Sequence, residues 1–247
     1  MSVHVYGSSE ELAEAAAREF AAKAEEAIEE RGRFAVVLAG GSTPESTYQI
    51  LARDYSDRIA WSKVYVFFGD ERAVPPHHED SNLKMASELL LDHVPVGNFH
   101  RIRGELPPEE AAEAYEEELR TFFQTEDVPR FDLILLGLGA DGHTASLFPW
   151  TPALEVQDRW VVANPVPRLD TTRITLTVPV INAALAVYFL VEGEDKAEAV
   201  REVLEGDADP RGYPAKLIQP PGGPEWMLDR YAASLLSDLY RGGSRTA

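Results

Sequence analysis

The sequence predicts an α/β fold in which a doubly wound, mostly parallel sheet is covered by helices on both faces. Short runs rich in β-branched residues alternate with longer helical patterns along the chain, as expected for strands joined by crossover helices. Several of the short runs are apolar on both faces, which is typical of central strands buried from both sides. The length of 247 residues fits a single domain, and we expect residues 1–247 to form it.

Short apolar runs of four to seven residues are expected to be the strands. Glycine ends or directly follows four of them, so the chain can turn sharply where these strands finish. The expected strands are residues 3–6, 34–39, 63–68, 131–137, 159–163, 173–178 and 186–191.

Longer segments with helical periodicity are expected to be the helices. The first begins with Ser8 or Ser9 as its N-cap, has glutamates in its first turn and ends at Gly32. The third begins near Asn82, and Asp80 or Ser81 is expected to cap it. The glutamate-rich faces of these helices are interpreted as solvated surface. The expected helices are residues 8–32, 44–54, 81–91, 107–123, 195–206 and 224–240.

The composition excludes several classes of function. The chain has no cysteine, so disulfides, thiol nucleophiles and cysteine-bound zinc are excluded. Its formal net charge of −19 argues against nonspecific binding to nucleic acids and acidic membranes, because both need attraction to a polyanion. No apolar run approaches the roughly 20 residues of a membrane span, and no secretion signal is visible, so we expect a cytoplasmic protein. An anionic ligand would therefore need a locally positive pocket.

The loop after the second expected strand has the features of an anion site. Gly40 and Gly41 allow an unobstructed backbone turn. Ser42 and Thr43 supply hydroxyl groups, and Pro44 fits the first turn of a helix. The free N–H groups and the positive end of that helix would bind an anion, most naturally a phosphate. The same pattern also fits an ordinary strand-to-helix turn with a serine or threonine cap.

The loop after the third expected strand contains Asp70, Glu71 and Arg72, at the edge where open α/β sheets bind their ligands. The forked guanidinium of Arg72 could hold a carboxylate, a carbonyl oxygen or a phosphate. It could equally form a surface ion pair with its acidic neighbours. The nearby residues 77–80, His-His-Glu-Asp, are not interpreted as a metal site, because adjacent side chains point in different directions and no second ligand set is spaced to match.

The loop after the fourth expected strand contains the strongest candidate for chemistry, His143. Residues 137–142 match the pattern G-x-G-x-x-G of dinucleotide-binding sites. Pro149 and Pro152 interrupt the segment within about two turns, however, so it cannot open the long helix that such a site needs. The glycines are better explained as a tight turn that directs Asp141 and His143 into a pocket. A neutral imidazole placed there could act as a base.

Two further cations follow later strands. Arg173 lies at the start of one expected strand, and Lys196 lies in the first turn of a helix that follows another. A cation at a helix N-terminus is electrostatically unfavourable unless an anion compensates it. Both residues are therefore candidates for phosphate contacts, although either could instead pair with surface glutamates.

Several stretches resemble, in this order, the 6-phosphogluconolactonase family: LAGGSTP, FFGDERAVPPHHEDSN, GLGADGHTASLFP, RITLT and LVEGEDKAEAV. The similarity extends from about residue 5 to residue 240, and the third stretch is its most specific part. The resemblance implies a Rossmann-like sheet, similar to that of glucosamine-6-phosphate deaminase, which binds a sugar phosphate in place of a dinucleotide. It also implies a monomer.

The resemblance implies hydrolysis of 6-phospho-D-glucono-1,5-lactone to 6-phosphogluconate in the oxidative pentose phosphate pathway, without a metal or an organic cofactor. By position in the motifs, His143 would be the general base, with Asp141 and Arg72 beside it. Asp141 could either orient the imidazole or contact a substrate hydroxyl. The phosphate would lie among a second set of residues, which are Gly40, Gly41, Ser42, Thr43, Arg173 and Lys196.

Two other functions stand as alternatives. A deaminase acting on glucosamine 6-phosphate would share the glycine turn and the Asp-Gly-His element, but such enzymes typically follow the histidine with IAFNEP, which contains a catalytic glutamate. Here the stretch is TASLFP, with Leu147 and Phe148 where that carboxylate would stand, and Arg72 stands where the deaminases tend to have tyrosine. A noncatalytic sugar-phosphate sensor joined to a DNA-binding module fits less well, because the chain has no basic helix-turn-helix segment.

Overall fold

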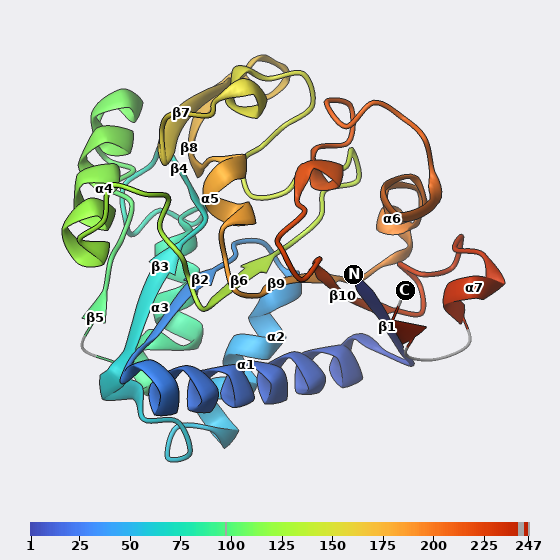
Figure 1. Ribbon diagram of the computed structural model, residues 1–247, viewed down its shortest axis with the longest axis horizontal. Helices are drawn as coiled ribbons and strands as arrows, with labels where there is room; N and C mark the ends of the chain where they lie inside the picture. The colour runs from blue at the N-terminus through green and yellow to red at the C-terminus, as the bar shows by residue number, and fades with distance from the viewer. Residues whose placement is uncertain (97, 242–244, 247) are drawn as a thin grey trace.

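The main sheet runs through the middle of the molecule and has eight strands in the order β11-β1-β10-β9-β6-β2-β3-β5 (Figure 1). The computed structural model describes residues 1–96, 98–241 and 245–246. Neighbouring strands are parallel, except that β11 is antiparallel to β1. These strands are β1 (Ser2–Tyr6), β2 (Phe34–Leu38), β3 (Val64–Phe68), β5 (Asn98–Phe99), β6 (Leu133–Leu136), β9 (Val187–Val191), β10 (Glu225–Asp229) and β11 (Arg245–Thr246).

A second, antiparallel sheet has three strands in the order β4-β8-β7. The expected strands 159–163 and 173–178 belong to this sheet and not to the parallel one, which corrects the expectation of a single sheet. The reason is that β3 continues through Gly69 into a short strand whose edge pairs with β8, and Leu176 N–H donates to the Gly69 carbonyl over 2.9 Å. The strands are β4 (Asp70–Arg72), β7 (Val161–Val166) and β8 (Thr171–Leu176).

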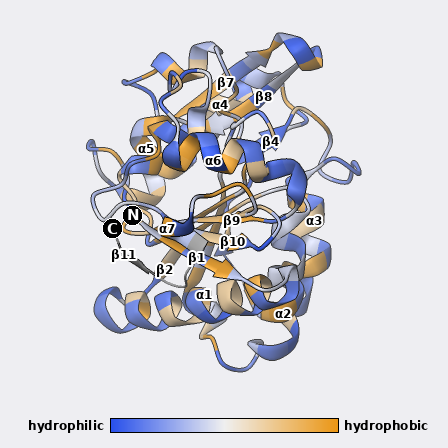
Figure 2. Ribbon diagram, turned by 90° about the vertical axis from the view of Figure 1, so that its right-hand side faces the viewer, coloured by the Kyte–Doolittle hydropathy of each residue, from blue (hydrophilic) through white to orange (hydrophobic). Residues whose placement is uncertain are grey.

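Helices cover both faces of the main sheet, as the sequence predicts. In both views α1 and α2 lie on one side of the sheet, whereas α5, α6 and the small sheet lie on the other (Figures 1 and 2). The α-helices are α1 (Ser9–Arg31), α2 (Thr43–Asp54), α3 (Asn82–Leu89), α4 (Pro108–Phe123), α5 (Val178–Asn182), α6 (Ala197–Glu205) and α7 (Asp238–Arg241). The 3₁₀ helices are η1 (Trp61–Lys63), η2 (Leu91–His93), η3 (Pro152–Glu155), η4 (Pro167–Leu169), η5 (Glu194–Lys196) and η6 (Pro214–Leu217).

The predicted helix caps are present. The side chain of Ser8 accepts a hydrogen bond from the N–H of Glu11, and Gly32 ends α1 in the left-handed conformation with φ of 75°. The side chain of Ser81 accepts from the N–H of Lys84 at the start of α3. Of the two pairs of candidates, Ser8 and not Ser9 caps α1, and Ser81 and not Asp80 caps α3.

The helix expected over residues 224–240 is wrong for most of its length. Its first part is β10, which pairs with both β1 and β9, and only residues 238–241 are helical. Trp226, Met227 and Leu228 are buried there. Local spacing of apolar residues favours a helix, but the gap between two parallel strands requires an extended apolar segment, and this long-range pairing overrides the local preference.

The core lies on the central strands. Strands β2, β6 and β9 are buried along their whole length, as expected for runs that are apolar on both faces. Figure 2 shows hydrophobic residues on the strands of the sheet and hydrophilic residues over much of the outer face of α1. Within the ranges that the structure describes, no helix is both long and apolar enough to cross a membrane.

The strand order creates a switch point between β2 and β6. From β2 the chain winds toward β3 and β5 on one side, and from β6 it winds toward β9 and β10 on the other. The loops that leave neighbouring strands in opposite directions diverge, which opens a crevice at the carboxyl ends of those strands. The loops after β2, β3, β6 and β9 all emerge at this edge, because these strands are parallel.

Candidate active site

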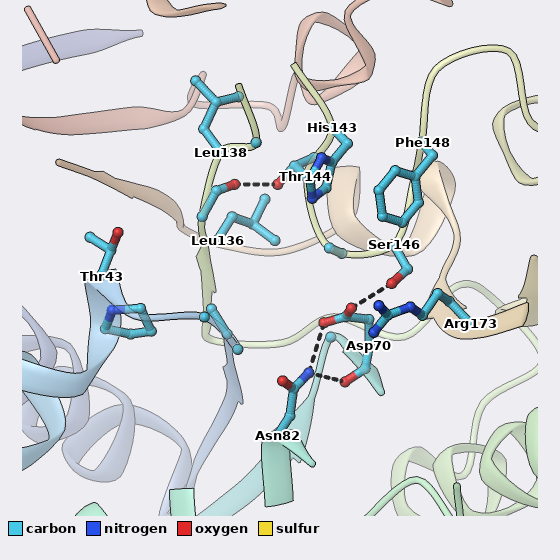
Figure 3. A pocket seen from close by; sticks show the side chains of 18 of the residues that line it. Thr43, Asp70, Asn82, Leu136, Leu138, His143, Thr144, Ser146, Phe148 and Arg173 are labelled. Carbon is cyan, nitrogen blue, oxygen red and sulfur yellow. Dashed lines mark hydrogen bonds between the residues drawn. The ribbon is translucent and has the colours of Figure 1, made fainter. Parts of the chain in front are cut away.

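A pocket of about 420 Å³ lies at the switch point. Figure 3 shows Thr43 on one side of it and the rings of His143 and Phe148 on another. All but one of the residues proposed from the sequence line this pocket: Gly40, Gly41, Ser42, Thr43, Arg72, His143, Arg173 and Lys196. The exception, Asp141, lies behind His143. The segments after β2, β3, β6 and β9, together with β8, are far apart in the sequence and meet at this one site.

The glycine turn lies against the start of α2. Gly41 has a φ of 87°, which favours glycine, and a Cβ on Gly40 would lie only 2.0 Å from Asn82 Oδ1. Ser42 is the N-cap of α2, but its side chain makes no capping hydrogen bond. Pro44 has no N–H group, and the N–H of Glu45 donates to the Ser42 carbonyl over 3.1 Å, which leaves the N–H of Thr43 in the first helical turn for an anion.

Arg72 is held by a polar network and not by its acidic neighbours. Its Nη1 donates to the carbonyl of Asp80 over 2.5 Å and to Asn82 Oδ1 over 2.7 Å. Asn82 Nδ2 donates in turn to Asp70 Oδ1 over 3.2 Å, and Ser146 Oγ donates to Asp70 Oδ2 over 2.6 Å (Figure 3). In the part of the chain that the structure describes, Arg72 forms no ion pair. The surface-pair interpretation of Arg72 is therefore wrong.

Glu71, in contrast, is a structural residue. It is 2% exposed, and its carboxylate accepts hydrogen bonds from the backbone N–H groups of Arg72, Asn82 and Leu83. Burial raises the pKa of Glu71, although these hydrogen bonds act in the opposite direction. The residue attaches β4 to the beginning of α3.

Arg173 lies beside Arg72 on the neighbouring strand of the small sheet, since the two residues are directly opposite in the register of β4 and β8. Like charges in such a pair repel unless an anion lies between them. Burial lowers the pKa of Arg173, and the charge of Arg72 lowers it further. The buried Nε of Arg173 has no hydrogen-bond partner among the described residues. These observations point to an anionic ligand.

Lys196 completes the cationic side of the pocket. It ends η5, just before α6, and its ammonium lies 2.9 Å from a carboxylate oxygen of the neighbouring Asp195. It therefore has a local acidic partner, as the alternative interpretation allowed, and also lines the pocket.

His143 is fixed by a short loop after β6. The N–H of Gly139 donates to the His143 carbonyl over 2.8 Å, and a Cβ on Gly139 would lie 2.0 Å from His143 Nδ1, so only glycine fits there. The imidazole stacks on Phe148, with ring centroids 4.2 Å apart and an angle of 25°. Its Nδ1 donates to Asp141 Oδ1 over 2.5 Å, whereas its Nε2 has no hydrogen bond to any described residue. Nε2 is consequently the atom available to a ligand.

Asp141 is charged at neutral pH. Burial alone would raise its pKa, but hydrogen bonds and charge from His143, together with the charge of Arg168, lower it to about 2. Arg168 forms an ion pair with Asp141 and lies over the ring of Phe148, 5.0 Å from its centroid. An ionised carboxylate against Nδ1 fixes the tautomer that leaves Nε2 as an acceptor.

Sequence reasoning missed several pocket residues, namely Asn82, Ser146 and Arg168 as parts of the site. Asn82 was identified only as the beginning of a helix. Arg168 lies in the turn between two strands that the sequence did not pair, so no local signal directs it to the pocket. The described residues contain no group of His, Asp and Glu side chains arranged to hold a metal ion, and this includes residues 77–80.

Comparison with known proteins identifies the family. The model of the glucosamine-6-phosphate isomerases/6-phosphogluconolactonase family matches residues 7–226. The chain belongs to this family. It is an enzyme of this family, as its motifs predict. A 6-phosphogluconolactonase from Synechocystis sp. is 48% identical over 215 residues, which cover 85% of this chain and 88% of the relative.

Solved structures of the family share the fold. The 6-phosphogluconolactonase from Trypanosoma cruzi has a TM-score of 0.84 and 27% identity, with coverage of 95% of this chain and 96% of that chain. A monomeric glucosamine-6-phosphate deaminase has a TM-score of 0.79 and 25% identity, with coverage of 95% and 100%. The predicted α/β fold is confirmed. The fold alone does not separate the two activities, so the pocket must do so.

Proposed function

We propose that the protein hydrolyses 6-phospho-D-glucono-1,5-lactone to 6-phosphogluconate, with His143 as the general base. The observation that carries the proposal is one pocket in which the Nε of Arg173 and the Nε2 of His143 both lack a hydrogen-bond partner among the described residues. A ligand with a phosphate at one end and an activated ester at the other fits both features. Relatives named 6-phosphogluconolactonase at up to 48% identity support the same substrate.

The phosphate is proposed to bind at the start of α2. The N–H of Thr43 and the helix dipole attract it, with Ser42 and Thr43 as hydroxyl donors. Arg173 and Lys196 then neutralise its charge. Holding the phosphate fixes the position of the lactone carbonyl near His143, so that the energy of phosphate binding orients the reacting group.

In the proposed reaction, a water molecule donates a hydrogen bond to Nε2 of His143 and attacks C1 of the lactone. The imidazole accepts the proton as the new C–O bond forms, and Asp141 stabilises the resulting imidazolium through Nδ1. When the tetrahedral intermediate collapses, the bond from C1 to the ring oxygen breaks. That oxygen receives the proton from the imidazolium and becomes a hydroxyl group. C1, which now carries the oxygen of the attacking water, becomes the carboxylic acid of the product.

The oxyanion of the intermediate needs hydrogen-bond donors. Arg72 is a candidate: Asp80 and Asn82 occupy its Nη1, which leaves other guanidinium N–H groups for the ligand. The backbone N–H groups of the loop at 137–142 are the alternative donors. We propose that Asp141 orients the imidazole, because it lies behind the ring and not on the pocket surface.

The deaminase alternative is less compatible with the surroundings of His143. Leu147 is fully buried, and Phe148 stacks on the imidazole where that activity would need a carboxylate. The test is acid release from the phosphorylated lactone, measured against spontaneous hydrolysis, beside ammonia release from glucosamine 6-phosphate. The proposal expects a large acceleration in the first assay and background in the second. Ammonia release with no lactone hydrolysis would contradict it.

Some expectations stay predictions. We propose that the reaction needs no metal or organic cofactor and that the enzyme works as a monomer in the cytoplasm. An Arabidopsis thaliana relative with 37% identity is named chloroplastic.

A further inference from the structure

Three side chains form a closed ring of contacts with the imidazole of His143. His143 donates to Asp141 over 2.5 Å and stacks on Phe148 at 4.2 Å. Arg168 forms an ion pair with Asp141 and lies over Phe148 at 5.0 Å. Each member therefore has two neighbours in the ring, and Arg168 is the only one of them that comes from outside the loop after β6.

The position of Arg168 is set by the small sheet. It lies in η4, between β7 and β8, where Val166 pairs with Thr171. Asp170 has a φ of 47° and turns the chain back into β8. The same hairpin carries Arg173, so the segment that positions the unpaired cation also places Arg168 over the ring of Phe148.

We propose that Arg168 is a positioning residue, which acts through Asp141 and Phe148 to hold the imidazole of His143 with Nε2 toward the pocket. Arg168 neutralises the carboxylate oxygen that His143 does not use, and its planar group packs on the aromatic face. Without Arg168, Asp141 and Phe148 would be able to change rotamer. The orientation of the imidazole ring would then no longer be fixed. The effect on catalysis rests on the proposed function, whereas the effect on the imidazole does not.

The competing role is direct binding of the substrate, because Arg168 is a cation and lines the pocket. Its guanidinium is engaged by Asp141 and Phe148, while the Nε of Arg173 has no partner among the described residues. Arg173 thus has a buried donor left for an anionic ligand, whereas the guanidinium of Arg168 is already used. The two roles differ in kinetics, since lost uniform binding raises KM and lost positioning lowers kcat.

The kinetic test compares Arg168→Ala, Arg168→Lys and a matched control. We expect Arg168→Ala to lower kcat about tenfold with KM changed less than about twofold, and Arg168→Lys to lie between it and the parent, because lysine keeps the charge but not the planar stack. The control is Arg211→Ala. Arg211 makes the same kinds of contact outside the pocket, an ion pair with Asp209 at 2.7 Å and a position over Trp150 at 5.1 Å. It should leave kcat unchanged.

A spectroscopic test follows the imidazole without substrate. The Nδ1 proton of His143 should give a downfield proton resonance, assigned by its loss in His143→Gln. In Arg168→Ala this resonance should broaden or disappear, and it should persist in Arg211→Ala. If the parent hydrolyses no lactone but the resonance behaves in this way, the proposed function fails and the positioning role stands. An unchanged resonance in folded Arg168→Ala, or a tenfold rise in KM at constant kcat, would overturn the positioning role.

A second variant tests the ring if Arg168→Ala folds poorly. Phe148→Leu removes the stacks on both His143 and Arg168, and should lower kcat by a similar factor. Residues that act through one unit are not additive, so Phe148→Leu combined with Arg168→Lys should be little worse than Phe148→Leu alone. Full additivity would show that Arg168 and Phe148 act separately, and would contradict the proposal.

Discussion

The two ring nitrogens of His143 have different surroundings, and this difference is the basis of its proposed role. Nδ1 is occupied by a carboxylate whose pKa is lowered to about 2, so the bond is present at any pH at which the enzyme would work. Nε2 is left without a partner among the described residues and faces a pocket with a cationic side. A histidine without such neighbours would not have one ring nitrogen fixed by a carboxylate and the other directed into a pocket.

Replacing Asp141 by asparagine tests the orientation of the imidazole. The amide can donate to Nδ1, which favours the tautomer with the proton on Nε2, and that tautomer cannot accept a proton from water. We expect kcat for lactone hydrolysis to fall about a hundredfold in Asp141→Asn, with a small change in KM. A kcat within about threefold of the parent would show that Asp141 does not set the tautomer.

The lowered pKa of Asp141 also predicts a pH dependence of stability. A carboxyl with a pKa lowered from 3.8 to about 2 by folding stabilises the native state above pH 3.8. This contribution is lost as the pH falls through that interval, because the unfolded state then binds the proton first. The difference in unfolding free energy between the parent and Asp141→Asn should therefore shrink on acidification. Urea unfolding at a series of pH values measures it, and a constant difference would contradict the prediction.

At the level of elements, local patterns predicted most of the fold. The periodicity of α1, α3 and α4 and the caps of α1 and α3 lie within single segments, and so do the apolar runs of β2, β6 and β9. The segment 224–240 was assigned wrongly because its role as β10 depends on two strands that are distant in sequence. The small sheet was missed for the same reason, since its pairing is not local.

The site was predictable where it follows from parallel strands. Loops at the carboxyl ends of β2, β3 and β6 must meet at one edge, so the glycine turn, Arg72 and His143 could be grouped from the sequence. Arg168 could not be grouped with them, because it reaches the pocket through an antiparallel hairpin. Asn82 could not either, since its contacts with Gly40 and Arg72 depend on the packing of α3.

The small sheet is attached to α4 through Glu116, which gives an element-level prediction. Its buried carboxylate accepts from the N–H groups of Trp160 and Val161, over 3.1 and 3.3 Å. Glu116→Ala leaves these donors without a partner, so we expect a loss of about 2–3 kcal/mol in unfolding free energy. Urea denaturation measures the loss, and the exposed neighbour in Glu117→Ala is the control, with a change of about 0.5 kcal/mol or less. Equal effects of the two variants would contradict the assignment.

The whole molecule combines a net charge of −19 with a pocket that gathers cations. Its overall field repels anions, so we propose that affinity for a phosphate comes from close contacts with Arg173, Lys196 and the start of α2. The acidic surface also disfavours the polyanionic partners that compete for such a pocket. Selection of small phosphorylated ligands is therefore a property of the entire charge distribution.

Phosphate binding should be visible in the stability of the whole chain. At a concentration of about 100 Kd, a ligand that binds only the native state stabilises it by about 2.7 kcal/mol, which corresponds to roughly 5–10 °C in Tm at this size. We expect 6-phosphogluconate to raise Tm by this amount in the parent and much less in Arg173→Ala. Calorimetry with sodium chloride at equal ionic strength is the control. An equal shift in both proteins would remove Arg173 from the phosphate site.

The most direct measurement compares lactone hydrolysis and product binding in His143→Ala. The variant removes Nε2 but leaves the cationic side of the pocket intact. We expect hydrolysis to fall to the spontaneous rate, while the Kd for 6-phosphogluconate, measured by titration calorimetry, stays within about threefold of the parent. If His143→Ala keeps more than about a tenth of the parent kcat, the imidazole is not the base, and the central claim is contradicted.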